Sequence, residues 1–397
     1  MSASEPASEP AGGIGAQPTD FEDAILSTVR EFVDRDVRPR ARDIEHRDEY
    51  PEEFIETMKV LGIYGLAISE RFGGTPVSTP CFAQVTAELA RGWMSLAGAM
   101  GGHTVVCALI ERFGTETQKA RYLPRLATGE VRATMALTEP DGGSDLQAMR
   151  TTARRDGAHY LLNGTKTWIS NAARAGLIAV LCKTDPDSDP AHRGISILLV
   201  EKVDGVEVSA PFHKLGYRGV ETCEVSMAGA RVDAGALLGE REGDGFSQMM
   251  WGLEIGRIQV AARAVGVAQA AFDDALAYAQ DRTAFGRPIW KHQSIGNYLA
   301  DMATKLTASK QLVDHAARRH DQGSRSDLEA GMAKLFASEA AMEITLSAMR
   351  IHGGYGYSTE FDIERYFRDA PLMIIGEGTN EIQRNVIVRQ IIERGGL

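Results

Sequence analysis

The sequence is poor in cysteine, and this absence excludes two classes of protein. Its 397 residues include four cysteines, and Cys81, Cys107, Cys182 and Cys223 form neither a CxxC pair nor a paired metal-ligand spacing. A disulfide framework and a cysteine metal site are therefore not expected. A reducing, cytoplasmic compartment fits this composition best.

Basic charge is also in short supply. Lys and Arg number 43 against 54 Asp and Glu, which gives a net charge of −11 and argues against a nucleic-acid-binding surface. The sequence lacks an unbroken apolar run of about 18 residues, so we expect no helix inserted in a membrane. Hydrophobic residues at 44% and charged residues at 24% are typical of a soluble globular protein.

Several short functional motifs are missing as well. The chain has no dinucleotide GxGxxG, no phosphate loop GxxxxGK[ST], no HExxH zinc helix and no GxSxG nucleophile elbow. Residues 1–19 also lack the apolar stretch of a secretion signal and the Arg-rich character of a transit peptide. We expect these residues to form a disordered tail.

Three regions with different sequence patterns follow one another along the rest of the chain. Residues 20–132 carry helical periodicity, and the predicted helices run from Phe21 to about Pro39, from Pro51 to Gly62, and over 82–91, 96–112 and 116–128. Residues 133–240 hold short β-rich runs separated by turn residues, which predict a small sandwich or barrel with no helical crossover for a parallel sheet. Residues 241–397 return to long helices, at about 246–281, 294–320 and 328–350, which favour an antiparallel bundle.

Three segments have both a structural and a functional interpretation. ALTEPDGGSD, residues 136–145, is either a surface turn or a loop whose N–H groups and Ser144 hydroxyl reach a phosphate or a polar ring edge. Trp168 is either a core residue or a flat surface for stacking on a ring system. Arg282, between two predicted helices, either caps a helix end or grips a pyrophosphate.

Two glycine-rich segments lie near the C-terminus. Gly353, Gly354 and Gly356 follow a long helix and permit positive φ angles and close backbone approach to a ligand. Glu377 stands between two glycines in an apolar setting, just before a helix that Thr379 caps. It is either a solvated loop residue or a partly buried carboxylate with a raised pKa, the condition for a general base.

Taken in order, five segments resemble the acyl-CoA dehydrogenase family of flavoproteins. They are ALTEPDGGSD, WIS, KLGYRG, GVAQAAFDDALAYAQDRTAFGRPIWKHQ, and IHGGYGY leading to GEGTNEIQ, and the similarity extends from about Phe21 to the C-terminus. The resemblance implies an α+β fold with a helical N-terminal domain, a middle β-barrel and a C-terminal four-helix bundle. It also implies FAD as cofactor, an acyl-CoA substrate, a homo-oligomer that is usually a tetramer, and an electron-transfer flavoprotein as acceptor.

The resemblance further implies that residues from two subunits bind FAD. The positions that match the flavin side are Met135, Leu137, Thr138, Ser144, Trp168, Ile169 and Ser170. The other matching positions are Arg282, Phe285, Gln293, Arg350, Gly353, Gly354, Thr379 and Glu381. In the family, the positions of Arg282, Phe285, Gln293 and the loop around Gly353 contact the adenine and pyrophosphate of the FAD in a neighbouring subunit.

By the family's chemistry, Glu377 removes the α-proton of the thioester while the β-carbon passes a hydride to flavin N5, giving the trans-2-enoyl-CoA. Substrate contacts would come from Ser144, Glu254, Arg257 and Gly378. Some relatives place the base at the position of Gly256, but a glycine cannot serve.

Two positions depart from the family pattern. Arg350 stands where many members have Gln, which brings an extra positive charge toward the FAD pyrophosphate. Gly376 stands where many have Tyr, which predicts a wider pocket for a branched or bulky acyl group. Two alternatives stay open: a relative that desaturates carrier-protein-bound acyl groups or acts as an oxidase, and a non-catalytic helical binding protein.

Overall fold

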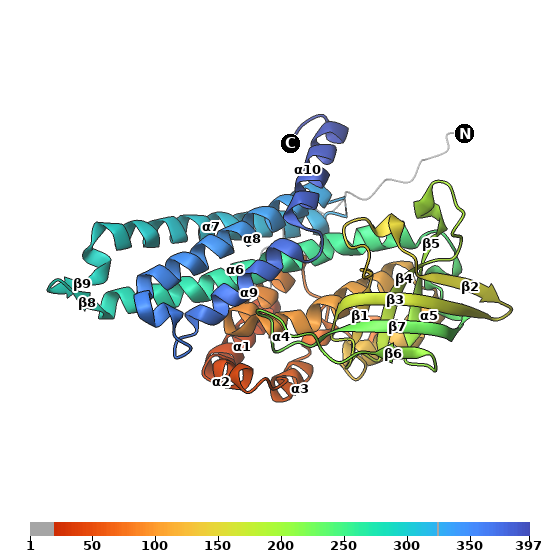
Figure 1. Cartoon of the computed structure of the whole chain (residues 1–397), viewed down its shortest axis with the longest axis horizontal. Helices are drawn as coiled ribbons and strands as arrows, with labels where there is room; N and C mark the ends of the chain where they lie inside the picture. The colour runs from red at the N-terminus through yellow and green to blue at the C-terminus, as the bar shows by residue number, and fades with distance from the viewer. Residues whose placement is uncertain (1–19, 324) are drawn as a thin grey trace, which may run out of the picture.

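The computed structural model describes residues 20–323 and 325–397 (Figure 1). The tail predicted at residues 1–19 lies outside the described residues. Helical segments at both ends of the chain are joined by one β-rich segment. The sheet lies at one end of an elongated molecule, beside α4 and the start of α6, and the long C-terminal helices extend to the other end. The predicted α+β class is confirmed.

The N-terminal part is helical, as predicted. Its elements are α1 (Asp20–Phe32), the π-helical turn η1 (Val33–Val37), α2 (Ala41–His46), α3 (Glu52–Val60), α4 (Thr79–Phe113) and α5 (Glu116–Ala127). Helix α2 was not predicted. The helices predicted at 82–91 and 96–112 are both within α4, in which only Trp93 departs from helical geometry (φ −159°, ψ 117°).

Helix α4 also corrects the expectation about apolar runs. Among the described residues it is the one helix long and apolar enough to cross a membrane by length and composition. Within its most apolar window, however, 94% is buried inside the protein. Its apolar character is explained by packing, because α4 lies against α6 and contacts the sheet as well.

The middle part forms one seven-stranded sheet. Its strands are β1 (Ala133–Ala136), β2 (Thr152–Asp156), β3 (His159–Ser170), β4 (Leu177–Lys183), β5 (Ile195–Glu201), β6 (Val206–Val208) and β7 (Thr222–Asp233). The order is β1-β4-β2-β3-β7-β6, with β5 also paired to β4. As expected, no helical crossover lies between the described strands. Strands β1 and β4 are nevertheless parallel, because the chain returns through the β2–β3 hairpin instead of a helix.

The C-terminal part is the predicted helical bundle. Helices α6 (Gly245–Asp281), α7 (Gln293–Asp321) and α8 (Asp327–His352) begin and end within a few residues of the predicted bounds, and α9 (Ile363–Ile375) and α10 (Asn380–Arg394) complete it. A short hairpin, β8 (Thr283–Ala284) and β9 (Arg287–Pro288), joins α6 to α7. Its position at the far end of the bundle is visible in Figure 1.

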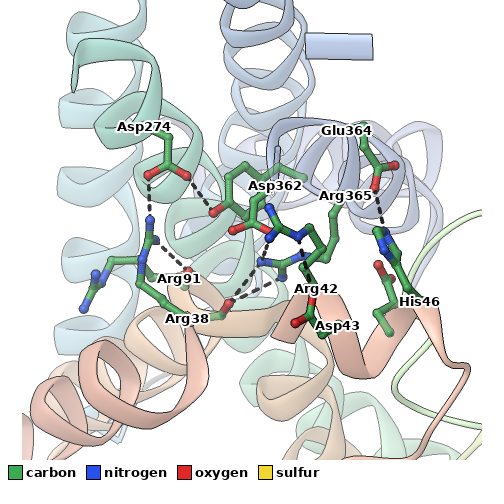
Figure 2. A network of polar contacts seen from close by, with 12 residues as sticks. Arg38, Arg42, Asp43, His46, Arg91, Asp274, Asp362, Glu364 and Arg365 are labelled. Atoms are coloured by element: carbon green, nitrogen blue, oxygen red, sulfur yellow. Dashed lines mark hydrogen bonds and ion pairs between the residues drawn. The ribbon is translucent and has the colours of Figure 1, made fainter. Parts of the chain in front are cut away.

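A polar network fixes the N-terminal helices on the bundle (Figure 2). Arg38 donates to Asp274 of α6 at 2.6 Å, and the Tyr366 hydroxyl donates to the same carboxylate at 2.9 Å. Arg365 of α9 is 1% exposed and lies 3.4 Å from Asp362. Because charged groups leave water only when they are paired, these contacts hold the N-terminal helices, α6 and α9 in one arrangement.

We predict that Asp274→Ala destabilises the protein by about 1–3 kcal/mol, because it leaves Arg38 and the Tyr366 hydroxyl without their acceptor. Urea unfolding measures the change. Glu31→Ala is the control, since it removes an exposed i,i+4 pair with Arg35 that is worth about 0.5 kcal/mol or less. Equal losses in the two variants would contradict the prediction.

Candidate active site

The loop between α9 and α10 carries Glu377. Helix α9 ends before Gly376, and the Thr379 hydroxyl accepts a hydrogen bond from the N–H of Ile382 at 3.4 Å, which starts α10. Between these points Glu377 has φ +54° and Gly378 has φ +88°. A non-glycine residue with positive φ is uncommon and marks a position that its surroundings over-determine.

The Glu377 carboxylate is buried against α6. Its side chain is 14% exposed, and within the described chain its Oε2 atom has no hydrogen-bond partner. A Cβ atom at Gly256 would lie 1.9 Å from that oxygen. From the sequence, we interpreted Gly256 only as a position that cannot act as a base. The structure shows that its missing side chain makes room for the carboxylate of Glu377.

Opposing effects act on the protonation of Glu377. Burial raises the pKa of this carboxyl above its ordinary value, while the positive charges of Arg263, Lys334 and Arg257 act to lower it. Nη2 of Arg263 is 3.7 Å from Oε1 of Glu377. The site therefore holds a desolvated carboxylate beside cations, an arrangement suited to taking up a proton.

Lys334 of α8 anchors the loop and was missed by the sequence analysis. Its side chain is fully buried, and Nζ donates to the carbonyl of Ile374 at 3.1 Å, the carbonyl of Gly378 at 2.9 Å and Oδ1 of Asn380 at 2.9 Å. Burial lowers the pKa of Lys334 to about 8. The available signal was a single lysine within the apolar helical run GMAKLFA.

The predicted flavin-side residues gather where β1 and β3 end. The N–H of Thr167 donates to the carbonyl of Thr138 at 2.9 Å, and the Thr134 hydroxyl donates to the carbonyl of Ser170 at 2.7 Å. Met135, Leu137 and Thr138 are half-buried, Ile169 is buried and Ser144 is exposed. One end of the sheet therefore brings these positions together.

Trp168 lies among them and is not a core residue. Its side chain is 60% exposed, its φ is +61°, and its ring centroid is 5.0 Å from that of Phe212. An aromatic ring held at a strand end by an unusual backbone angle is available for stacking.

The ALTEPDGGSD segment is an internally bonded loop and more than a simple surface turn. Glu139 accepts hydrogen bonds from the N–H groups of Arg150 and Thr151 and forms a buried pair with Lys166 at 2.9 Å. Burial alone would raise the pKa of Glu139, but the hydrogen bonds from Thr151, Arg150 and Lys166 outweigh it and lower the pKa to about 2. Ser144 is exposed beyond this anchor.

The second predicted group surrounds a cavity of about 690 Å³ at the far end of the bundle. Its lining includes Arg282, Phe285, Gly353 and Gly354. Phe285 is 95% exposed, and Gly353 has φ +61° with no atom near its missing Cβ. Gln293 and Arg350 are exposed beyond this cavity, and Glu381 is exposed on α10; the guanidinium of Arg350 lies 5.8 Å from the Tyr298 ring.

The cavity at Arg282 is far from Glu377 within one chain. Gly256, which contacts Glu377, and Arg282 are separated by about seven turns of α6, or roughly 40 Å.

Glu254 and Arg257 contact the start of α8. Oε2 of Glu254 accepts hydrogen bonds from the N–H and hydroxyl of Ser326, each at 2.9 Å. Arg257 forms a buried ion pair with Asp327 at 3.0 Å. Burial raises the pKa of Glu254. The charge of Arg257 also acts on Glu377, and each of the two side chains already has a partner in the chain.

Three family models match the chain, one for each of its three parts. Family models for the acyl-CoA dehydrogenase N-terminal, middle and C-terminal domains match residues 19–130, 134–230 and 243–392. The chain belongs to the acyl-CoA dehydrogenase family. Members of this oxidoreductase family are FAD flavoproteins, and the buried Glu377 occupies the loop that the family resemblance indicated.

Curated relatives cover almost the whole chain. A (2S)-methylsuccinyl-CoA dehydrogenase of Cereibacter sphaeroides is 41% identical over 96% of this chain and 71% of its own length. An acyl-CoA dehydrogenase of Bacillus subtilis is 41% identical over 92% and 96%. The caffeyl-CoA reductase-Etf complex subunit CarC of Acetobacterium woodii is 36% identical over 93% and 98%.

Several solved structures share the fold. Butyryl-CoA dehydrogenase of Megasphaera elsdenii has a TM-score of 0.92 at 34% identity, covering 96% of this chain and 100% of its own. A glutaryl-CoA dehydrogenase in complex with glutaryl-CoA has a TM-score of 0.91 at 34% identity, over 96% and 97%. An FAD complex of PigA has a TM-score of 0.90 at 27% identity, over 96% and 100%.

We predict that Lys334→Met loosens the loop of Glu377 while the fold persists. The substitution keeps the apolar stem but removes three buried hydrogen bonds from a charged donor, each worth about 1.5–3 kcal/mol, and leaves only Gln383 on the carbonyl of Gly378. Hydrogen exchange of the amides of residues 376–379 should become at least tenfold faster. The control is Lys305→Met, which removes a lysine of α7 that pairs with Glu343 of α8 on the surface. Unchanged exchange in Lys334→Met would refute the anchoring role.

Proposed function

We propose that the protein catalyses the FAD-dependent α,β-dehydrogenation of an acyl-CoA thioester to the trans-2-enoyl-CoA. The observation that carries the proposal is the buried carboxylate of Glu377, which has an unpaired Oε2 atom and a raised pKa. Glu377 takes the α-proton at this oxygen. FAD, when bound, accepts the hydride that leaves the β-carbon, so proton and hydride together account for the two hydrogens removed.

Other residues of the loop support this step. Removal of a proton from a weakly acidic C–H places negative charge on the thioester oxygen, which backbone N–H donors stabilise. The N–H of Glu377 is the donor that we assign, and Lys334 and Gln383 hold its loop by donating to the carbonyl of Gly378. Ser144, Glu254, Arg257 and Gly378 are assigned to the CoA ester. Burial of the site excludes water while the thioester oxygen carries negative charge.

The residues present fit FAD. Exposed Trp168 offers a stacking surface beside the strand ends, and the distant cavity with Arg282 and two glycines suits an anionic, flat group. On the family resemblance, we propose a homo-oligomer, most simply a tetramer, in which neighbouring subunits complete each site. Thr379 and Glu381 are assigned to the cofactor on the family resemblance.

Relatives guide the choice of electron partner and of direction. One relative is named as a subunit of a reductase-Etf complex, so we propose an electron-transferring flavoprotein as acceptor. The same residues serve reduction of an enoyl thioester if the partner supplies electrons. We also propose a cytoplasmic location, which the four buried, unpaired cysteines suit.

A substrate panel separates the proposal from its alternatives. Acyl-CoA thioesters and carrier-protein-bound acyl groups are compared with an artificial electron acceptor, and peroxide is measured in parallel. A dehydrogenase reduces the acceptor with CoA thioesters and forms little peroxide. Turnover of carrier-bound groups alone, or stoichiometric peroxide, would favour the related desaturases and oxidases, and colourless protein without flavin would favour a binding protein.

We predict that Glu377→Gln lowers kcat by roughly 100- to 10,000-fold, because a unique base is removed. Flavin content and CoA-ester binding should persist, since the amide has the same size. Glu393→Gln on the exposed side of α10 is the matched control. Activity retained in Glu377→Gln would rule out this residue as the base.

The raised pKa of Glu377 also predicts a pH dependence. The base acts only when ionised, so kcat/KM should fall as the pH falls through that pKa. The midpoint of this loss should lie above 4.5, the ordinary value for glutamate. A pH profile for a slow substrate measures it, and a midpoint below the ordinary value would contradict the burial argument.

A further inference from the structure

Arg263 is a buried cation inside the site that the proposed reaction does not require. It lies on α6, is 7% exposed, and its Nη2 is 3.7 Å from the Glu377 carboxylate and 3.5 Å from Oε1 of Gln259. Both distances are long for hydrogen bonds. Nε of Arg263 has no partner in the described chain.

A second unused donor lies beside it. Gln259 is one helical turn before Arg263, is 1% exposed, and its Nε2 also lacks a partner among the described residues. Gly256, Gln259 and Arg263 follow one stripe of α6, since residues three and four apart share a helix face. Gly256 on this stripe contacts Glu377, so the unused donors face the reacting end of the site.

The fold leaves room for the guanidinium. A Cβ atom at Gly101 of α4 would lie 2.0 Å from Nη2 of Arg263. Glycine in the middle of a helix costs about 0.5–1 kcal/mol relative to alanine. The missing side chain of Gly101 therefore leaves space for the guanidinium of Arg263 between α4 and α6. A pocket for a purely hydrocarbon chain would not need this space.

We infer that Arg263 and Gln259 bind a carboxylate at the distal end of the acyl group, so that the substrate is the CoA monothioester of a short dicarboxylic acid. This inference rests on the proposed function. Two donors left unpaired in a buried place require an acceptor, and a planar guanidinium matches a carboxylate. The negative charge of that carboxylate offsets the positive charge of Arg263. With an uncharged acyl chain, Arg263 would have only Glu377 as a counterion.

The position of Arg263 also selects chain length. Its guanidinium is within 4 Å of the carboxylate that deprotonates the α-carbon, so the distal carboxylate has to lie only one to three bonds beyond the reacting carbons. Acids of the succinyl and glutaryl type meet this condition, and long dicarboxylic acids do not. The relative named for (2S)-methylsuccinyl-CoA and the neighbour that holds glutaryl-CoA act on esters of this chemical kind.

The test compares pairs of substrates that differ by carboxylate against methyl: (2S)-methylsuccinyl-CoA with 2-methylbutyryl-CoA, and glutaryl-CoA with valeryl-CoA. The full-length flavoprotein is assayed with an artificial acceptor. We expect the wild type to have the higher kcat/KM for the dicarboxylic member of at least one pair. In Arg263→Gln the loss on that member should exceed the loss on its neutral counterpart by on the order of 100-fold, and Arg263→Lys should restore part of it.

Two further variants guard the interpretation. Gln259→Leu should lower the same substrate preference to a smaller extent, which keeps the test usable if Arg263→Gln folds poorly. Arg318→Gln removes an arginine from the exposed side of α7 and should leave the preference unchanged.

Two results would overturn the inference. Equal losses on both members of a pair in Arg263→Gln would show that Arg263 acts only as a counterion of Glu377. A wild-type enzyme that turns over neutral thioesters and rejects dicarboxylic ones would refute the substrate class while the proposed function stands. Absence of flavin reduction by every thioester would refute the proposed function itself.

Discussion

The carboxylate of Glu377 is buried against the bare backbone of α6 at Gly256, and the rest of the site depends on this contact. A carboxylate leaves water only with help from nearby cations or hydrogen-bond donors. Arg263 supplies the nearest charge, at 3.7 Å. Lys334 supplies a second charge and at the same time ties the loop to α8. Positive φ angles at Glu377 and Gly378 are the backbone consequence of holding the loop in this place.

Small residues on the long helices make this arrangement possible. A Cβ atom at Gly98 of α4 would overlap the Tyr217 ring, and one at Gly101 would overlap the guanidinium of Arg263. The backbone N–H of Tyr217 in turn donates a hydrogen bond to the carboxylate of Asp369 at 2.6 Å. The site is thus assembled from α4, α6, α8, α9 and the loop before β7. The polar network of Figure 2 keeps several of these elements in a fixed relation.

Local charge and total charge have opposite signs in this protein. The net charge of −11 would repel anionic ligands such as FAD and CoA. Arginines on α6 and at its end provide positive charge where those ligands are expected, and buried or partly enclosed charges are screened less by salt than exposed ones.

The sequence by itself determined the class of fold and, through the family resemblance, pointed to Glu377 as the proposed base. Long Ala- and Leu-rich periods predicted α6, α7 and α8 closely, because helical periodicity is a local property. The ordered motifs around Trp168 and Glu377 indicated the family. The sequence did not predict β7, the parallel pairing of β1 with β4, or the continuity of α4 through Trp93, since strand pairing and helix breaks depend on partners distant in the chain.

Only the tertiary structure decided which residues accompany the base. Lys334 and Arg263 are single charges within apolar helical runs, and periodicity shows which face they occupy without showing what they meet. The same limit applies to Trp168, for which a core position was the simpler expectation and exposure is the observation. A residue type carries its chemistry in the sequence, but burial, distance and unused hydrogen-bond donors exist only between segments that folding brings together.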